Sequence, residues 1–261
     1  MLYKYFQKNN YEDFSSGKVI YQKAGFPNYP VRLAGEIFSR CLEYSGKNKV
    51  TLYDPCCGCG YMVTVLGFLF NEKIISIHAS DVSPDAVEIS EKNLSLLTIG
   101  GIEKRKNELT SFVENYGKDS HRDALLSLNR LRELHKHEIA INCFTADVLA
   151  SRSLDKRNFT ADIVMTDVPY GGLSVWQNEN DLSVEPDETE NRDQPDMQNG
   201  QSTPESQIDI LLDTIKPVLG PHSVISISYD NRNKISNDAY KTIDMIRTGR
   251  RKIEFLKLGK L

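Results

Sequence analysis

The stretch TLYDPCCGCGYMVTVLG, Thr51 to Gly67, decides the fold of this chain. A short apolar run ends at Asp54, two closely spaced glycines follow, and the apolar segment from Tyr61 to Phe70 predicts a buried helix. Glycines in a tight turn between a strand and a helix permit unusual backbone angles and close approach of a ligand. The stretch therefore predicts a strand–turn–helix unit that holds a ligand at its turn.

Three of the chain's five cysteines lie in this stretch, at Cys56, Cys57 and Cys59. A structural zinc site needs four ligands, usually as two spaced pairs, and the sequence offers no second pair. Adjacent cysteines do not easily bridge each other, and an odd, clustered set is typical of a reducing compartment. We therefore expect no metal and no disulfide, and we interpret the cysteines as small residues that fit a crowded turn.

Outward from this turn, apolar runs alternate with segments of helical periodicity. We expect strands over residues 49–53, 74–79, 140–145, 161–166 and 223–228, helices over 31–44, 61–70, 84–97 and 204–216, and a closing antiparallel pair over 241–246 and 251–258. Two charged amphipathic segments, 101–116 and 120–137, predict a helical hairpin inserted into this alternation. The pattern indicates a Rossmann-like α/β fold with a seven-stranded, mostly parallel sheet.

Carboxylates at the ends of the expected strands indicate which ligand the turn holds. A dinucleotide turn has a third glycine, where this chain has Val63, and Asp54 would repel a pyrophosphate. Asp54 would instead attract a cation such as the α-amino group of S-adenosylmethionine. Asp81, ending the second strand, has the position that holds ribose hydroxyls, and Asp147, after the third strand, could accept from the adenine amine. The predicted cofactor is S-adenosylmethionine, which makes the fold a class I methyltransferase.

The fourth expected strand ends in TDVPYGG, Thr166 to Gly172, which looks like the (Asp/Asn/Ser)-Pro-Pro-Tyr motif of methyltransferases that act on amino groups. Here Val168 replaces the first proline. Asp167 and the backbone carbonyl of Val168 could accept the two hydrogens of an exocyclic amine and orient its nitrogen. Val168 keeps the extended backbone, Pro169 is the motif's second proline, and Tyr170 could stack on a base, worth ~1–3 kcal/mol. These four residues are the predicted catalytic set.

Composition bounds the remaining possibilities. The 261 residues fit one domain, with an N-terminal helical extension over 1–48, the hairpin over 99–138 and a flexible loop over 177–203. Residues 178–196 hold eight carboxylates and one arginine, so they contribute −7 to a net charge of −4 and leave +3 for the rest. The chain begins without the apolar run of a signal peptide and has no ~20-residue apolar span, so we expect a cytoplasmic protein with no membrane contact and, as an interpretation, a monomer.

Four segments together resemble the AviRa family of avilamycin-resistance 23S rRNA methyltransferases. They are AGFPNYPVRLAGEIFSRCL (24–42), DPCCGCGYMVTVLG (54–67), ASDVSPDAVEISEKNLSLL (79–97) and TDVPYG (166–171), and the likeness includes the hairpin. The resemblance implies methylation of the exocyclic amine of a guanine in 23S rRNA, with the large ribosomal subunit as an alternative substrate, and resistance to orthosomycins. It also implies that the cofactor is held by the glycine turn and by the acidic residue that ends the second strand. In this chain these cofactor-binding residues are Asp54, Pro55, Cys56, Gly58, Gly60, Asp81 and Val82. The strand pattern adds Asp147 to them.

Other functions stay open on the sequence. An enzyme with the same motif could modify adenine in nucleic acid or a glutamine in a protein, and an idle protein could bind cofactor or RNA without catalysis. The intact motif at 167–170 argues against the idle protein, and Val63 with Asp54 argues against a dehydrogenase. Basic residues of the hairpin are interspersed with acids, which is typical of a solvated face. The C-terminal stretch RTGRRKIEFLKLGKL is more consistently basic and could neutralise RNA phosphates, through Arg247, Arg250, Arg251, Lys252, Lys257 and Lys260.

Overall fold

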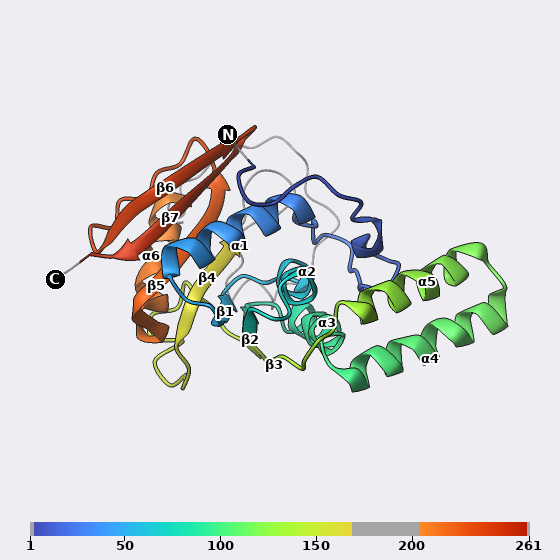
Figure 1. Cartoon of the computed structure of the whole chain (residues 1–261). Helices are drawn as coiled ribbons and strands as arrows, with labels where there is room; N and C mark the ends of the chain where they lie inside the picture. Colours follow the sequence, from blue (N-terminus) through green and yellow to red (C-terminus); the bar gives the residue numbers. More distant parts are fainter. Residues whose placement is uncertain (1–2, 169–203, 260–261) are drawn as a thin grey trace, which may run out of the picture.

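The computed structural model describes residues 3–168 and 204–259, with the side chains of 204–206 excepted. Within them, seven strands form one sheet in the order β3-β2-β1-β4-β5-β7-β6 (Figure 1). The first five pair in parallel, and β7 runs antiparallel to both β5 and β6. The strands are β1 (Val50–Asp54), β2 (Ile74–Asp81), β3 (Ala140–Thr145), β4 (Ala161–Asp167), β5 (Leu219–Asp230), β6 (Tyr240–Thr248) and β7 (Arg251–Leu258).

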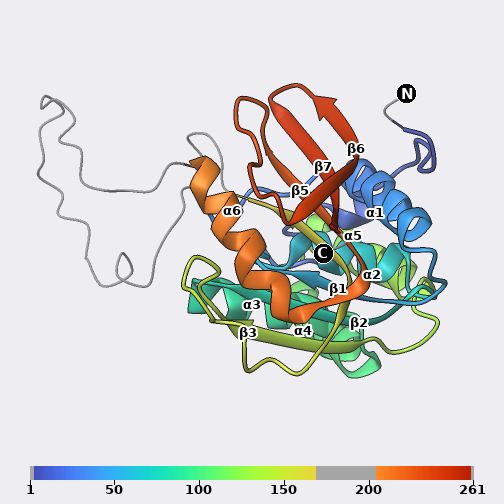
Figure 2. The same ribbon diagram turned by 90° about the vertical axis from the view of Figure 1, so that its left-hand side faces the viewer.

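Both faces of this sheet are covered, which is why its central strands are apolar on both sides. Leu52 and Ile163 belong to an apolar cluster with the helices on one face, while Tyr53 and Val164, the next residues along each strand, belong to a second cluster on the other face. Figure 2 shows α6 (Pro204–Ile215) on one side of the sheet and α1 (Val31–Ser45) on the other. The first face also carries α2 (Tyr61–Leu69) and α3 (Pro84–Ser95).

The inserted hairpin is formed by α4 (Ile99–Tyr116) and α5 (Asp119–Glu133) and projects from the body of the molecule (Figure 1). Its turn lies at Gly117, whose φ of 62° is in the left-handed region that ends α4. Short 3-10 turns, η1 (Glu12–Phe14) and η3 (Lys216–Val218), are the remaining elements of the described residues. The predicted fold class is confirmed, with strand boundaries extended by a few residues, most at β5.

Two general properties of the described residues bear on function. No helix there has the length and apolar character needed to cross a membrane. In that same part of the chain, no three His, Cys, Asp or Glu side chains are grouped so that they could hold a metal ion, and all five cysteines are free thiols. The predicted loop over 177–203, together with Pro169 and Tyr170, lies outside the described residues.

Candidate functional site

A cavity of about 440 Å³ opens at the edge of the sheet where the parallel strands end. This is where open α/β sheets bind ligands, because loops after neighbouring strands diverge there. Most of the residues predicted from the sequence line it: Asp54, Pro55, Cys56, Gly58, Asp81, Val82, Asp147, Asp167 and Val168. The strand ends therefore bring together four carboxylates that lie up to 113 positions apart in the chain, from Asp54 to Asp167.

The turn after β1 is held in place by Asp81. The backbone N–H of Gly58 donates to Asp81 Oδ2 at 2.8 Å, and the N–H of Ser83 donates to Oδ1 at 3.0 Å. Gly58 has a φ of 51°, and a Cβ built there would lie 3.0 Å from the ring of Phe26. A carboxylate oxygen has two lone pairs, so Asp81 can hold the turn and still accept from a ligand hydroxyl.

Gly60 occupies a different place from the one predicted for it. It does not line the cavity; it precedes α2 with a φ of 71°, and a Cβ there would lie 2.4 Å from Ser90 Oγ and 3.1 Å from Ser90 Cα. The missing side chain lets the start of α2 pack directly on α3. The structure thus gives Gly60 a packing role in the turn.

Burial sets the electrostatics of the cavity. Asp54 is 2% exposed, and this burial raises its pKa to about 7. The negative charges of Asp81 and Asp167 also raise this pKa, whereas the hydrogen bond from the N–H of Cys56 lowers it. Burial also raises the pKa of Asp81, although the hydrogen bonds from the N–H groups of Ser83 and Gly58 lower it in part. Like charges close together in a low-dielectric cavity disfavour ionisation, so a ligand cation beside Asp54 would relieve a strained arrangement.

Asp167 ends β4 at the rim of the cavity. It lies opposite Ser228 of β5, whose carbonyl accepts the N–H of Val168 at 3.0 Å. Asp167 Oδ2 accepts from Arg251 Nη2 at 3.4 Å, and the Arg251 guanidinium lies 4.6 Å from the centre of the Tyr29 ring. Tyr29 shares a hydrogen bond with Ser228 Oγ at 2.7 Å. The carboxylate of the predicted motif is therefore fixed by β5, β7 and the N-terminal segment together.

The N-terminal segment also forms a wall of the cavity, which the strand pattern did not predict. Its lining residues come from a stretch without helical or strand periodicity. The only signal for residues 25–29 was that AGFPNYP (24–30) belongs to the segments of the resemblance, and residues 21–23 had none. They are Tyr21, Gln22, Lys23, Gly25, Phe26, Pro27, Asn28 and Tyr29. Further lining residues that were not predicted are Cys57, Cys59, Tyr61, Met62, Ala146, Val148 and Leu149.

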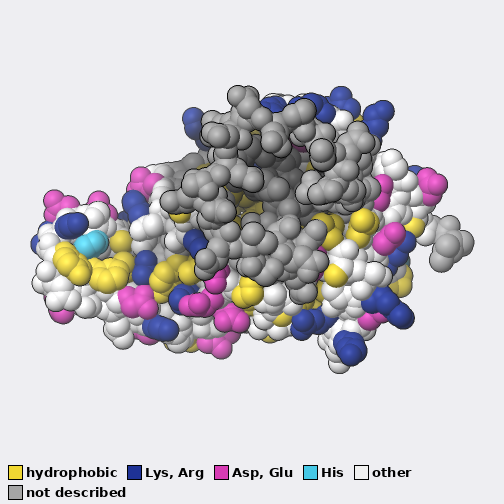
Figure 3. Space-filling view, turned by 180° about the vertical axis from the view of Figure 1, so that it is seen from behind, with side chains coloured by type: hydrophobic (Ala, Val, Ile, Leu, Met, Phe, Trp, Pro, Cys, Tyr) yellow, Lys and Arg dark blue, Asp and Glu magenta, His cyan; other side chains and the backbone are white. Residues whose placement is uncertain are grey.

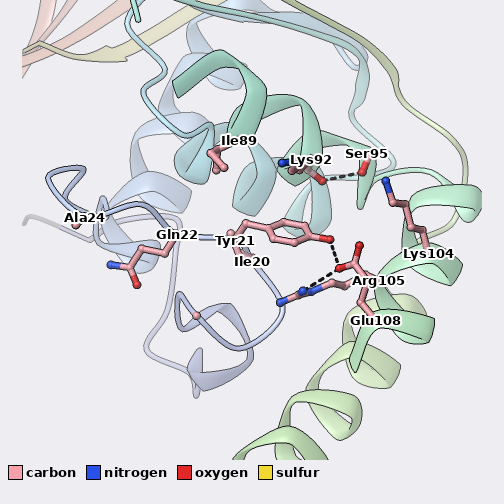
Figure 4. Close-up of a pocket in the computed structure, with 11 residues that line it drawn as sticks. Ile20, Tyr21, Gln22, Ala24, Ile89, Lys92, Ser95, Lys104, Arg105 and Glu108 are labelled. Atoms are coloured by element: carbon pink, nitrogen blue, oxygen red, sulfur yellow. Dashed lines mark hydrogen bonds and ion pairs between the residues drawn. The ribbon is translucent and has the colours of Figure 1, made fainter. Parts of the chain in front are cut away.

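A second hollow, on the other side of Tyr21 and Gln22, shows how this wall is anchored (Figure 4). Arg105 of α4 is 7% exposed and donates to the carbonyls of Val19 at 2.9 Å and Lys18 at 3.0 Å. Glu108 accepts from both Arg105 at 3.0 Å and the Tyr21 hydroxyl at 2.6 Å. The hairpin therefore fixes the segment that covers the cavity.

Comparison with known proteins shows the family to which this chain belongs. The model of the family described as rRNA methyltransferase AviRa matches residues 1–186. The 23S rRNA (guanine(2535)-N(1))-methyltransferase of Streptomyces viridochromogenes is 34% identical over 245 residues, which cover 92% of this chain and 88% of the relative. Two solved structures of the rRNA methyltransferase AviRa from the same organism, 32% and 30% identical, each superpose with a TM-score of 0.79 over 96% of this chain and 94% of theirs.

Proposed function

Because this chain belongs to the AviRa family of rRNA methyltransferases, we propose that it transfers a methyl group from S-adenosylmethionine to N1 of a guanine in 23S rRNA. The observation that carries the proposal is Asp167 at the rim of a carboxylate-lined cavity, fixed beside Arg251 and Tyr29. The choice of N1 comes from the name of the Streptomyces relative. It differs from the exocyclic amine that the motif predicted.

The residues of the cavity suit the proposed cofactor. Asp54 would pair with its α-amino group, Asp81 would accept from its ribose hydroxyls, and Asp147, whose Oδ1 takes the N–H of Leu149 at 2.8 Å, would accept from the adenine amine. Gly58 leaves the turn open for close approach, beside Pro55, Cys56 and Val82. The cavity volume of about 440 Å³ is within the ~300–1,000 Å³ typical of ligand pockets. The bound cofactor supplies a methyl group on a sulfonium, which is already activated for transfer.

Methylation of N1 requires Asp167 to take a proton as well as to orient the base. The N1 nitrogen of a neutral guanine carries a proton, and its electrons are delocalised into the ring, so the proton has to leave as the methyl group arrives. A carboxylate within hydrogen-bond reach can take that proton, and such general bases contribute ~10²–10⁴-fold in rate. Arg251 Nη2 donates to Asp167 Oδ2 at 3.4 Å and so holds the carboxylate in place at the rim of the cavity. Val168, Pro169 and Tyr170 would complete the pocket for the base.

The exocyclic amine of guanine is the second candidate, favoured by one observation. The sequence at 167–170 keeps the acid, the second proline and the tyrosine of the motif that methylates amino groups. In that chemistry Asp167 would accept a hydrogen bond from the amine, which loses one of its own protons once the methyl group has arrived, and the ring proton would stay on N1. The two candidates share cofactor, substrate and pocket, and differ in the atom that is methylated.

The test is transfer of radiolabelled methyl from S-adenosylmethionine to unmodified 23S rRNA, with large subunits, DNA and protein in parallel, followed by nucleoside analysis. Label in N1-methylguanosine supports the proposal, and label in N2-methylguanosine moves the reaction to the second candidate. Label confined to adenine or to a protein glutamine would overturn the substrate. A target guanine within a helix would have to be flipped out, so single-stranded fragments should be the better substrates.

We further propose that the modification protects the ribosome from orthosomycin antibiotics, which rests on the resemblance. Expression of the chain in a susceptible bacterium should raise the inhibitory concentration of avilamycin, and the Asp167→Ala variant should not. Equal susceptibility of cells with active enzyme and cells without it would contradict this part of the proposal while leaving the methylation standing.

A further inference from the structure

Beyond the cavity, basic side chains gather where β5, β6 and β7 reach the same edge of the sheet. Arg232 and Lys234 follow β5, Arg247 lies near the end of β6, and Arg250 lies in the turn before β7. We call these four residues the basic rim; all four are exposed. Figure 3 shows Lys and Arg side chains along the upper border of the molecule, where Figure 1 places the β6–β7 turn.

Hydrogen bonds make the rim a defined structure. Asp230, whose side chain is 3% exposed, takes both ends of the Arg232 guanidinium, at 2.8 and 2.9 Å, and Arg250 Nη2 at 3.3 Å. Asn231 ties the loop to the turn: its N–H donates to the carbonyl of Arg250 at 2.8 Å and its amide to that of Gly249 at 2.9 Å. The two arginines are thus held in place while 71% and 69% of their side chains face solvent.

The charged side chains of the basic rim are also all positive. Residues 231–237 and 245–253 contain no aspartate or glutamate, and Asp230, which holds the two arginines, is buried. The carboxylates of Asp209 and Asp213 contact the far end of this loop, at Ser236 and Asn237. Within the described residues, Lys234 and Arg247 form no ion pair, so their charges are available to a partner. By contrast, Lys252 is buried against Glu254, and Lys257 donates to the carbonyl of Tyr44. Only part of the basic C-terminal stretch therefore faces outward.

Its position connects the rim to the proposed chemistry. Arg250 is followed by Arg251, which donates to Asp167, and Arg251 lies opposite Asp230 in the strand register. A nucleotide at Asp167 would therefore have its flanking backbone beside the rim. We infer that the basic rim binds the phosphates of the RNA strand next to the methylated guanine. This inference rests on the proposed function and names a surface for its substrate.

The experiment compares salt dependence of RNA binding in full-length variants. R232Q/K234Q/R250Q removes three charges, and the amides at 232 and 250 still offer hydrogen-bond donors on the side of Asp230. The matched control is K49Q/K73Q, exposed lysines just before β1 and β2, at the opposite edge of the sheet. Each lost phosphate contact should reduce the slope of log Kd against log salt by about 0.7–0.9, so the triple variant should lose about 2.4. The control should keep the wild-type slope.

A second variant, K234Q/R247Q, leaves Asp230 and its partners untouched, and should reduce the slope by about 1.5. In both rim variants the Kd for S-adenosylmethionine should stay at the wild-type value. A wild-type slope in both rim variants would overturn the inference. It would also be overturned if the variants lost activity on large subunits but bound naked RNA as the wild type does, because the rim would then contact a ribosomal protein. Failure of the wild-type enzyme to methylate any RNA would instead overturn the proposed function, so the two failures are distinguishable.

Discussion

Asp54 carries the main electrostatic argument at the scale of the residue. Its pKa is raised to about 7, chiefly by burial, from an ordinary value of ~4. Because the pKa in the folded protein lies above that in the unfolded chain, the stability linked to this group is present below pH ~4 and is lost as pH rises toward 7. The protein without cofactor therefore has a strained carboxylate at pH 8, which a bound cation would stabilise.

The first prediction uses Asp54→Asn. Without cofactor, this variant should melt at a higher temperature than the wild type at pH 8 and at a similar temperature at pH 4, because it removes the buried charge. Its affinity for S-adenosylmethionine should fall by roughly 10- to 150-fold, the loss of ~1.5–3 kcal/mol from a hydrogen bond to a charged group. Thermal melts across pH and calorimetric titration measure both. A variant that binds cofactor as tightly as wild type would contradict the role given to Asp54.

The sequence alone predicted that these carboxylates line one cavity, because the topology of a parallel sheet brings the ends of its strands together. Asp54, Asp81 and Asp167 each end a parallel strand, and such ends meet at one edge of the sheet. The packing of Gly60 on Ser90 left no comparable signal, since the two residues lie 30 positions apart, one just before α2 and the other within α3. For the same reason the contact between Arg251 and Asp167 came only from the structure.

Among the elements, the N-terminal segment depends on the hairpin. Arg105 is almost buried and donates to two carbonyls of that segment, and Glu108 holds both Arg105 and Tyr21 (Figure 4). The inserted hairpin thus has a structural purpose, independent of any contact with RNA. It fixes a wall of the cavity in which the cofactor is proposed to bind.

The second prediction follows from this anchor. Arg105→Ala should lower the free energy of unfolding by about 3 kcal/mol, because it leaves the carbonyls of Val19 and Lys18 without their donor and removes one of the two donors to Glu108. It should also weaken binding of S-adenosylmethionine and speed proteolysis within residues 17–29. The control is Lys104→Ala, the exposed neighbour on the same helix. Equal melting temperatures and cofactor affinities for the two variants would show that the anchor does not support the cavity.

Most elements were predictable because their periodicity is strong. The segments before α2 and α3 carry local signals as well: Ser83 accepts from the N–H of Ala86 at 3.3 Å and Pro84 begins α3, as the sequence indicated. The order β5-β7-β6 could not be derived, because the last two strands form a hairpin that fits the sheet edge either way round. The wall over residues 21–29 is irregular backbone, which has no period to detect.

For the whole molecule, charge is unevenly distributed. Residues 178–196 contribute −7, and the rest of the chain carries +3, including the basic rim. An enzyme of negative net charge that acts on RNA therefore has its cations concentrated where the substrate is proposed to lie. Long-range repulsion from the acidic segment should slow association with RNA and weaken it at low salt.

The third prediction removes that segment. Deletion of residues 179–196 should change the melting temperature by less than about 2 °C, because a stretch so rich in carboxylates has few apolar side chains to bury. RNA binding should tighten at low salt and approach the wild-type value at high salt. A fall in melting temperature of more than about 5 °C would contradict the single-domain interpretation in which this segment is an appended loop.

The central claim, that Asp167 acts directly on the guanine beside a cofactor held by other residues, is tested by one comparison. Methyl transfer to 23S rRNA and binding of S-adenosylmethionine should be measured side by side for the wild type, Asp167→Ala and Asp167→Asn. We expect Asp167→Ala to lose ~10²–10⁴-fold in rate while its cofactor Kd stays within about threefold. Asp167→Asn should lose as much if N1 is methylated, since an amide cannot take the proton, and less if the exocyclic amine is. Equal loss of transfer and cofactor binding in Asp167→Ala, or full activity in it, would contradict the account.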